Sequence, residues 1–400
     1  MKILLINKFL HPNGGSETYV FQLGKCLQER GHQVEYFGME HENRIVGNRI
    51  HAYVRKRDYH GNGIAEKLRS ACNCIYSVEA RRKLRLVLED FQPDVCHLNN
   101  FHYQLTPSIL LEIRQWSRKT GRNCSILYTA HDSQLVCPNH LMRNPVTGEN
   151  CRQCLKGSFL PCVKGKCIHG SRLRSLLGAL DGWYWNHRRI YEMLDVVIAP
   201  SRFLARQLSV NDQIRDKIVV MPNFIRQPEV QIAEEKEPYV LYFGRYSKEK
   251  GIETLLQAVD ALPQIPLVFA GDGPLKPEIG KRQNVTDKGF LSEQELSDTI
   301  RKARFTVVPS ECFENCPFSV LESQLLGTPV LGAEIGGIPE LIRPGETGEL
   351  FESGNPDQLT RRIRELWQDT PRLQRYGETC KNTVFPTPRQ YCEMLEAYYQ

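Results

Sequence analysis

Residues 309–342 read PSECFENCPFSVLESQLLGTPVLGAEIGGIPELI, a stretch in which two kinds of secondary structure alternate. We expect a helix to begin near Pro317, because the fixed φ of proline suits the first turn of a helix. The short apolar run Pro329–Ala333 then has the composition of a parallel strand that is buried on both faces. A helix and a buried strand in direct succession are typical of an α/β domain.

The same alternation continues on both sides of this stretch. Three more apolar runs precede it, with helix candidates between them: Tyr239–Gly244, Pro266–Gly271 and Phe305–Ser310. The front half holds a second series: Lys2–Asn7, Gln33–Phe37, Asp94–Asn99, Cys124–Thr129, Asp195–Pro200 and Lys217–Pro222. Two such series predict an α/β protein with two doubly wound parallel-sheet domains that face each other across a cleft.

The segment QPEVQIAEEKEP, residues 227–238, separates the two series. Its two prolines, its acids and its few apolar residues predict a linker over residues 227–237. We therefore expect domains over residues 1–226 and 238–385. The last residues, 386–400, predict a helix that packs back on the first domain.

Composition limits the class of protein. With 41% hydrophobic and 24% charged residues in a chain of 400, the sequence is neither disordered nor fibrous. No apolar run approaches the roughly 18 residues of a membrane span. The start, MKILLIN, leads directly into a strand candidate and has no signal-peptide pattern. We expect a cytoplasmic protein whose thiols stay reduced.

The net charge of +6 is unevenly distributed. Residues 1–226 carry 33 Lys and Arg against 19 Asp and Glu, whereas residues 227–400 carry 19 against 27. A basic front half indicates anionic partners such as phosphates, a membrane surface or nucleic acid, or else an uneven solvated surface. The front half lacks the interleaved aromatic and basic residues of RNA-binding modules, so we expect no nucleic acid partner.

Two glycine-containing motifs follow strand candidates. In HPNGGSE, Gly14 and Gly15 precede a predicted helix over Ser16–Arg30, with Ser16 as the N-cap, and bare backbone there would let an anion approach free amides. In GRYSKEKG, Arg245 and Lys250 suit a diphosphate, although exposed surface cations would look the same. A strict GxGxxG and a P-loop lysine are both absent from these motifs.

Two glutamates, with seven residues between them, lie around the helix that begins near Pro317. Glu314 is expected in the loop before this helix, where it would reach sugar hydroxyls, and Glu322 inside it, where it would reach a ribose. The amides of Phe318, Ser319 and Val320 would face phosphates between the two carboxylates. A capping acid and an exposed helical glutamate would give the same spacing, but they would not explain the Arg/Lys motif upstream.

Taken together, these motifs resemble the retaining glycosyltransferases of family 4, which have the GT-B fold of two Rossmann-like domains. The resemblance rests on GG before the first helix, TAHD at Thr129–Asp132, GRxxxxKG at Gly244–Gly251, E-x7-E at Glu314–Glu322, and GGIPELI. It implies an EC 2.4-type enzyme that moves a sugar from a UDP- or GDP-linked donor to an acceptor hydroxyl with retention. The implied acceptor is a glycan or glycolipid, a lipid-linked or polysaccharide intermediate in cell-surface polysaccharide synthesis.

The resemblance also implies a role for individual residues. Gly14 and Gly15 would lie beside the donor diphosphate, which Arg245 and Lys250 would neutralise as it leaves. Glu314 would order the donor sugar, Glu322 would hold the ribose, and His131 would contact the sugar from the other domain. Phe290 and Leu291 would flank the base, together with Gly289. Family members often carry Gly-Phe-Gly near residues 314–317, where this chain has Glu-Asn-Cys-Pro.

The acceptor side is less sharply marked. Asp132 is a candidate base, an acceptor contact or a structural carboxylate, and His97 and Asn99 are weaker acceptor-side candidates at a strand end. Since the chain has no Asp-x-Asp motif, we expect no catalytic metal. The alternatives are a nucleotide-sugar epimerase or hydrolase on the same GT-B scaffold, and a non-enzymatic binder of nucleotide sugar or nucleic acid.

Five cysteines lie close together in a Cys-rich insertion at residues 137–170. Their spacing is C-x13-C-x2-C-x7-C-x4-C, and the residues are Cys137, Cys151, Cys154, Cys162 and Cys167. We expect four of the five to hold a structural zinc ion, which would supply folding energy that the few apolar residues there do not. An iron–sulfur cluster and reversible disulfides are the alternatives.

Residues 171–194 combine four arginines with leucines and tryptophans. This composition suits a helix that lies on anionic lipid, at the inner face of the cytoplasmic membrane. A domain helix that buries its Leu and Trp face is the ordinary interpretation of the same pattern.

Overall fold

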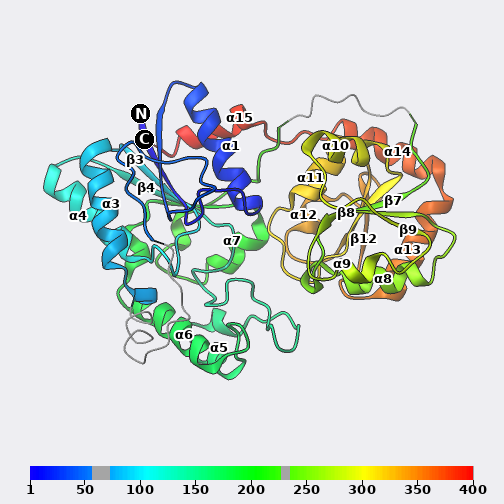
Figure 1. The fold of residues 1–400 in the computed structure, drawn as a ribbon, viewed down its shortest axis with the longest axis horizontal. Coiled ribbons are helices and arrows are strands. Elements are labelled where there is room, and N and C mark those ends of the chain that lie inside the picture. The colour runs from blue at the N-terminus through cyan, green and yellow to red at the C-terminus, as the bar shows by residue number, and fades with distance from the viewer. Residues whose placement is uncertain (56–72, 227–234, 400) are drawn as a thin grey trace. The chain divides into compact units, whose positions relative to one another are not determined.

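The computed structural model describes residues 1–55, 73–226 and 235–399. The chain forms two compact units (Figure 1): unit 1 comprises Met1–Pro222 and Pro388–Gln400, and unit 2 comprises Asn223–Thr387. Most of the predicted linker, residues 227–234, lies outside the described residues.

Unit 1 is built on a six-stranded parallel sheet in the order β2-β1-β3-β4-β5-β6. Its strands are β1 (Lys2–Ile6), β2 (Gln33–Phe37), β3 (Val95–Leu98), β4 (Ser125–Thr129), β5 (Val196–Ala199) and β6 (Ile218–Val220). The helices are α1 (Gly15–Glu29), α3 (Val78–Phe91), α4 (Ser108–Thr120), α5 (Leu160–Lys164), α6 (Arg172–His187), α7 (Arg202–Leu208) and α15 (Pro388–Glu396). Ile3, Leu4 and Leu5 of β1 are fully buried, as a strand covered on both faces requires.

Unit 2 repeats this plan, with the order β12-β11-β10-β7-β8-β9 and parallel pairing throughout. Its strands are β7 (Val240–Arg245), β8 (Leu267–Asp272), β9 (Val285–Asp287), β10 (Phe305–Val308), β11 (Val330–Ala333) and β12 (Gly348–Phe351). Its helices are α8 (Ile252–Asp260), α9 (Lys276–Ile279), α10 (Glu293–Lys302), α11 (Phe318–Leu325), α12 (Ile338–Leu341), α13 (Pro356–Gln368) and α14 (Thr370–Lys381). The predicted class, an α/β protein with two doubly wound parallel sheets, is confirmed.

Each strand order reverses once, and this reversal locates the candidate sites. In unit 1 the chain turns back between the neighbouring strands β1 and β3, and in unit 2 between β7 and β10. Ligands of open α/β sheets bind outside the carboxyl ends of the strands at such a switch point. The loops after β1, β3, β7 and β10 are therefore the places to examine.

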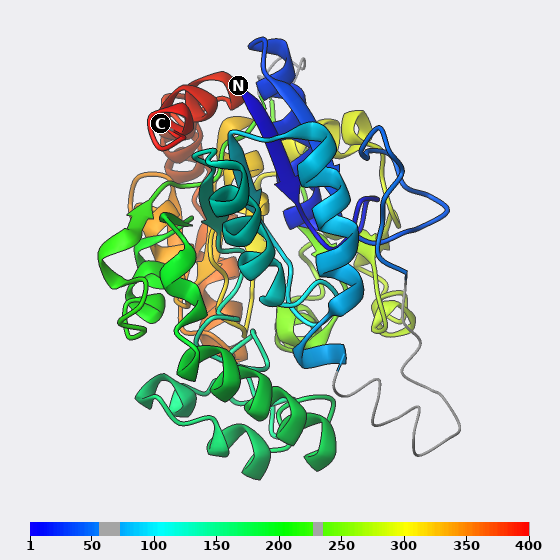
Figure 2. The ribbon, with the colours of Figure 1, turned by 90° about the vertical axis from the view of Figure 1, so that its left-hand side faces the viewer.

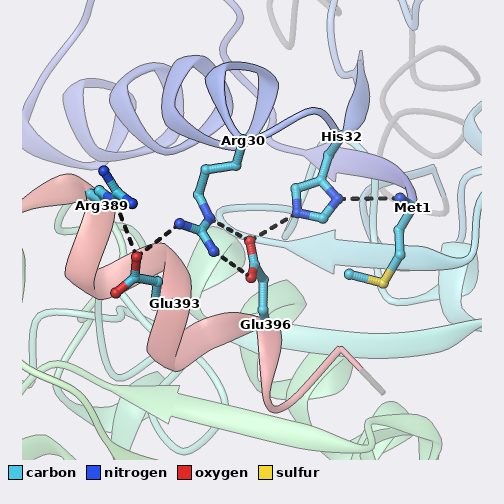
Figure 3. Close-up of polar contacts among 6 residues, drawn as sticks. All are labelled: Met1, Arg30, His32, Arg389, Glu393 and Glu396. Atoms are coloured by element: carbon cyan, nitrogen blue, oxygen red, sulfur yellow. Dashed lines mark hydrogen bonds and ion pairs between the residues drawn. The ribbon is translucent and has the colours of Figure 1, made fainter.

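The C-terminal helix α15 is attached to unit 1 by a group of ionic contacts (Figure 3). Arg30 makes two hydrogen bonds to the Glu396 carboxylate, at 2.6 and 2.8 Å, and a third to Glu393 at 2.9 Å. The ring of His32 bridges Glu396 at 2.9 Å and the N-terminal amine at 3.2 Å. The end of the chain is thus joined to residues at the end of α1 and the start of β2.

The predicted start of the first helix is wrong in one detail. We expected Ser16 as the N-cap, but the helix begins at Gly15, and Gly14 occupies the cap position without a side-chain hydrogen bond. The hydroxyl of Ser16 instead accepts a hydrogen bond from Asn100 at 3.0 Å. A serine one position inside the helix is therefore used to join α1 to the loop after β3.

Candidate functional site

Lys250 and Glu314 form an ion pair at the switch point of unit 2. The Lys250 Nζ lies 2.5 Å from the Glu314 Oε1, which also accepts a hydrogen bond from the Ser310 hydroxyl at 2.8 Å. Burial is the largest single effect and lowers the pKa of Lys250, but Glu314, with smaller contributions from Cys312 and Glu249, raises it, so the net pKa lies above its usual range. The Lys250 ammonium is therefore charged at neutral pH.

Two glycines allow the backbones around this pair to approach closely. Gly251 has φ +73°, and a Cβ there would lie 1.8 Å from the carbonyl oxygen of Pro309. Gly336 has φ +61°, and its Cβ would lie 2.3 Å from the carbonyl oxygen of Glu314. The KG and GGIPELI motifs thus share one function, which is to pack the loops after β7 and β11 against the loop that carries Glu314.

Arg245 lies at the carboxyl end of β7, two strand positions beyond the buried Phe243. Its side chain is exposed, and within the described parts of the chain its guanidinium has no hydrogen-bond or ion-pair partner. It lines an open depression together with Ser247, Asp272 and Gly273. A cation that no protein group neutralises is available to an anionic ligand.

The start of α11 provides backbone donors and a second carboxylate. Within the described residues, the amides of Phe318 and Ser319 have no partner, whereas that of Val320 donates to the carbonyl of Pro317 at 3.1 Å. The Val320 amide is thus not a free donor, because it is already used within the first turn of the helix. Glu322 is partly buried without a hydrogen-bonding partner among the described side chains, and burial raises the pKa of this carboxyl to about 7.

The predicted base-flanking segment lies just beyond β9. Phe290 is 87% exposed, whereas Leu291 is partly buried and packs against the buried cluster that includes Tyr239. The Gly289 carbonyl accepts a hydrogen bond from Gly271 at 2.7 Å, so the segment is attached to the end of β8. An exposed aromatic ring on a fixed loop can stack on a planar ligand.

In unit 1, His131 lies at the end of β4, beside the end of β3. Its Nε2 and the Asn99 Oδ1 are 2.9 Å apart, and its ring packs edge-on against Tyr19 at 5.1 Å. Burial lowers the pKa of His131 to about 4, so the imidazole is neutral at pH 7. The Asn99 Nδ2 is buried, with no hydrogen-bond partner in the described structure. Gly14 and Gly15 begin α1 in the same unit.

Asp132 is held by groups that sequence reasoning did not identify. Its carboxylate lies 3.4 Å from the His140 Nδ1 and accepts a hydrogen bond from the Gln134 amide at 2.9 Å. Burial acts to raise the pKa of Asp132, but His140 and the Gln134 amide outweigh it and bring the pKa to about 2. A carboxylate held so firmly in its ionised form is a poor proton acceptor, which argues for a contact rather than a base.

His97 does not fit the acceptor-side role that the sequence suggested. The residue is fully buried, and both ring nitrogens are occupied: Nδ1 lies 2.9 Å from the Tyr399 hydroxyl and Nε2 lies 2.7 Å from the Thr129 hydroxyl. Burial lowers the pKa of His97 to about 3. The prediction for His97 is therefore wrong, since this side chain lies in the core and joins β3 and β4 to the C-terminal segment.

The five clustered cysteines converge in the folded chain. All of them line one small cavity, together with Arg143 and Arg152: Cys137, Cys151, Cys154, Cys162 and Cys167. Burial raises the pKa of Cys137 to about 11 and that of Cys154 to about 12, so these thiols are protonated without a bound cation. Across residues 1–55, 73–226 and 235–399, no three His, Cys, Asp or Glu side chains stand ready to hold a metal ion.

Two family models match the chain. The model described as "Glycosyltransferase Family 4" matches residues 13–226, and the model described as "Glycosyl transferases group 1" matches residues 223–383. The chain belongs to glycosyltransferase family 4. The resemblance seen in its motifs is thereby confirmed, and the two matched segments together span nearly the whole sequence.

Individual relatives are more distant. Sulfoquinovosyl transferase SQD2 of Arabidopsis thaliana is 30% identical over 215 residues, which are 48% of this chain and 42% of SQD2. N-acetyl-alpha-D-glucosaminyl L-malate synthase of Bacillus anthracis is 21% identical over 384 residues, 93% of this chain and 89% of that protein. Across SQD2 and the next two relatives, the alignments span only 40–61% of the relatives' own length.

Solved structures of glycosyltransferases share the fold. Anabaena HepE in complex with UDP superimposes with a TM-score of 0.69 at 16% identity, covering 99% of both chains. The lipopolysaccharide outer core galactosyltransferase WaaB superimposes with a TM-score of 0.62 at 18% identity, covering 100% of this chain and 99% of WaaB. The GT-B architecture is therefore confirmed. Within the described residues, every helix is too short or too polar to cross a bilayer.

Proposed function

We propose that the protein transfers a sugar from a nucleotide diphosphate sugar to an acceptor hydroxyl, with retention of configuration. The observation that carries the proposal is the charge arrangement at the switch point of unit 2. Among the described residues the Arg245 guanidinium has no partner, and Lys250 is held by Glu314, in a chain that belongs to a glycosyltransferase family. This is the place and the charge that a leaving diphosphate requires.

The arrangement supports a division of labour between the two cations. Negative charge grows on the departing phosphate as the glycosidic bond breaks, and fixed positive groups lower the energy of that state. Arg245 would make the new contacts, whereas Lys250, ion-paired at 2.5 Å, would share its charge between the phosphate and the Glu314 carboxylate. Glu314 would at the same time be held in place to order hydroxyls of the donor sugar.

Other candidate residues would bind the rest of the donor. Glu322 would hold the ribose, the amides of Phe318 and Ser319 would face the phosphates, and Phe290 would stack on the base. In unit 1, Gly14 and Gly15 would lie against the diphosphate, and neutral His131 would contact the sugar. The leaving phosphate would take up the acceptor proton on the same face, so the reaction needs no separate base and no catalytic metal.

UDP is the donor nucleotide that the comparisons favour, because a solved structure with the same fold is a complex of HepE with UDP. Thermal shift with UDP and with GDP, each at the same concentration, tests this proposal. A ligand at about 100 times its Kd stabilises the native form by ~2.7 kcal/mol, which the melting temperature reports. We expect UDP to raise the melting temperature. If neither UDP nor GDP raised it, the result would contradict nucleotide-dependent transfer.

The acceptor proposal is a glycan or glycolipid, in the form of a lipid-linked or polysaccharide intermediate. Incubation with the donor alone distinguishes transfer from the hydrolase and epimerase alternatives. A transferase should leave most of the donor intact until an acceptor is added. Rapid release of free sugar, or conversion of the donor to an isomer, would indicate the alternative enzymes.

We also propose a structural zinc ion at the Cys-rich insertion. The support is that five thiols from separate turns line a single cavity, in a segment with few apolar residues. Four thiolates would hold the ion after small side-chain rotations, and the metal would deprotonate them despite their raised pKa values. Arg143 and Arg152 at the same cavity would offset the negative charge of the site.

A further inference from the structure

Helix α6 carries a stripe of apolar side chains that the structure leaves exposed. The stripe, which we call the α6 stripe, consists of Leu173, Leu176, Leu180 and Trp183. Their exposed fractions are 67%, 42%, 42% and 58%. Spacings of three and four residues place the four side chains on one face of the helix. Five of the eighteen exposed large hydrophobic side chains among the described residues lie between residues 160 and 183.

The opposite face of α6 is the one that packs on unit 1. Ser175, Gly178 and Trp185 are buried there, and the Trp185 indole donates a hydrogen bond to the carbonyl of Ile75 at 3.0 Å. The two tryptophans of this helix are therefore in opposite environments. The ordinary interpretation of the sequence, a helix that buries its Leu and Trp face, holds for Trp185 and fails for the α6 stripe.

The surroundings of the α6 stripe are strongly basic. Residues 151–190 carry eight Lys and Arg but a single acid, Asp181, which is buried. Burial also raises the pKa of Asp181 to about 8, so it adds little negative charge at neutral pH. Four exposed cations have no ion-pair partner within the described chain: Lys164, Arg172, Arg174 and Arg188.

The position of the helix allows contact with a flat surface. Figures 1 and 2 both show α5 and α6 side by side at the end of unit 1 that lies farthest from α15. Leu160 of α5 is also 65% exposed. The C-terminal residues that cover α1 therefore do not reach this end.

We propose that the α6 stripe docks on an anionic lipid bilayer, with α6 lying in the plane of the interface. Leucines and a tryptophan would enter the boundary between headgroups and acyl chains, and Arg172, Arg174 and Arg188 would bind lipid phosphates. The phosphates of a nucleic acid could bind the arginines, but a nucleic acid has no apolar surface that would cover three exposed leucines. A protein partner would need acids that match the arginines, and a second copy of this chain offers none on this face.

This docking surface goes beyond sugar transfer and does not depend on it. It needs no donor, no acceptor and none of the residues assigned to the unit 2 site. Binding to vesicles can therefore be measured with protein that has no nucleotide bound. Failure of the membrane proposal leaves the transfer proposal intact, and the converse also holds.

The test is co-sedimentation with vesicles of phosphatidylcholine alone and of phosphatidylcholine with phosphatidylglycerol. We expect the wild-type chain to bind only the anionic vesicles and to be released by added salt. The double variant Leu176→Glu/Leu180→Glu should lower the partition coefficient by about tenfold or more, because two apolar anchors are lost. Arg172→Glu/Arg174→Glu should lower it comparably, and Trp183 fluorescence should shift to shorter wavelength on binding.

Matched variants on α3 provide the controls. Leu86→Glu and Arg82→Glu make the same chemical changes at exposed positions of unit 1, and they should bind as the wild type does. Unchanged melting temperatures would show that all variants fold. Three results would overturn the proposal. The α3 controls could lose as much vesicle binding as the α6 variants, the α6 variants could bind vesicles as well as the wild type, or the chain could dimerise through α6 without vesicles.

Discussion

The guanidinium of Arg245 is the charge on which turnover should depend most. We predict that Arg245→Ala lowers kcat/KM by roughly 100- to 1,000-fold, as the loss of one donor to a developing anion does in other enzymes. The physical reason is that no side chain in the described part of the protein pairs with this guanidinium, so its charge is available to the phosphate. Steady-state kinetics with a donor and a soluble acceptor measures the effect.

Lys248 offers the matched control for that substitution. It lies in the same motif, but it is 71% exposed and pairs with Glu253 at 2.9 Å. Lys248→Ala should therefore change kcat/KM by less than about threefold, as expected of an exposed surface pair. Similar losses in the two variants would show that general surface charge, rather than Arg245, promotes the reaction.

Glu322 should make donor binding depend on pH. Its pKa is raised to about 7 by burial, and only the ionised carboxylate can accept hydrogen bonds from both ribose hydroxyls. UDP binding should therefore strengthen as the pH rises from 6 to 8. Calorimetric titration should show this trend in the wild type and a weaker one in Glu322→Gln, whose amide does not titrate.

The comparison with Glu322→Gln also separates two titrations. The terminal phosphate of UDP ionises near neutral pH in both proteins, so it contributes equally to the two curves. A wild-type curve parallel to that of the variant would mean that Glu322 does not contact the ribose.

Motifs single out individual candidate residues but not the contacts between them. Arg245 and Lys250 are candidates because cations at a strand end suit a diphosphate, and Glu314 is a candidate because its spacing from Glu322 places it in the loop before a helix. The bond between Lys250 and Glu314 could not be predicted, since it joins loops 64 positions apart. His97 was misjudged for the same reason: its burial depends on Tyr399, which lies at the opposite end of the chain.

At the scale of elements, the attachment of α15 should depend on pH. Its Glu396 has a pKa lowered from 4.5 to about 2, chiefly by hydrogen bonds from Arg30. A carboxyl whose folded pKa is lowered stabilises the fold above its unfolded pKa and loses that effect as the pH falls towards the folded value. The contribution should therefore be complete at pH 7 and fade between pH 4.5 and 2.

We predict that Glu396→Gln lowers the melting temperature at pH 7 by ~2–4 °C, the shift that about 1 kcal/mol causes in a unit of this size. The difference from the wild type should shrink as the pH falls below 4.5. Glu29→Gln is the control, because Glu29 is 64% exposed and its ion pair with Lys25 is long, at 3.9 Å. An unchanged difference at pH 3 would mean that packing, rather than charge, attaches α15.

Elements were easier to predict than their contacts. Ten of the twelve strands in the described chain could be located within a residue or two, because parallel strands buried on both faces form short apolar runs, whereas no range was predicted for the short strands β9 and β12. Composition did not show which face of α6 packs on unit 1. Leu173, Leu176 and Leu180 lie on one face of that helix and are exposed, whereas the buried face carries Gly178 and Trp185.

At the scale of the whole molecule, each unit has a hydrophobic core of its own. One large cluster of buried side chains contains only residues of unit 1, and another contains only residues of unit 2. We therefore predict two calorimetric transitions, because separate cores need not unfold together. UDP should raise the transition of unit 2, where Arg245 and Glu322 lie, and Arg245→Ala should weaken that response. A single transition that shifts as a whole would contradict independent units.

The cysteine cavity gives the same experiment a second use. If zinc is held there, purified protein should contain one zinc ion per chain by elemental analysis, and chelation should lower the transition of unit 1 alone. Cys154→Ser should lose the metal, whereas Cys124→Ser, at a buried cysteine just before β4, should keep it. Four of the five thiols bind the ion in this proposal, so one of the five cysteines is not a ligand. Substituting serine for that one cysteine should also leave the metal in place. Metal-free protein in which all five thiols react freely would refute the zinc proposal and would leave the disulfide alternative to be tested under oxidising conditions.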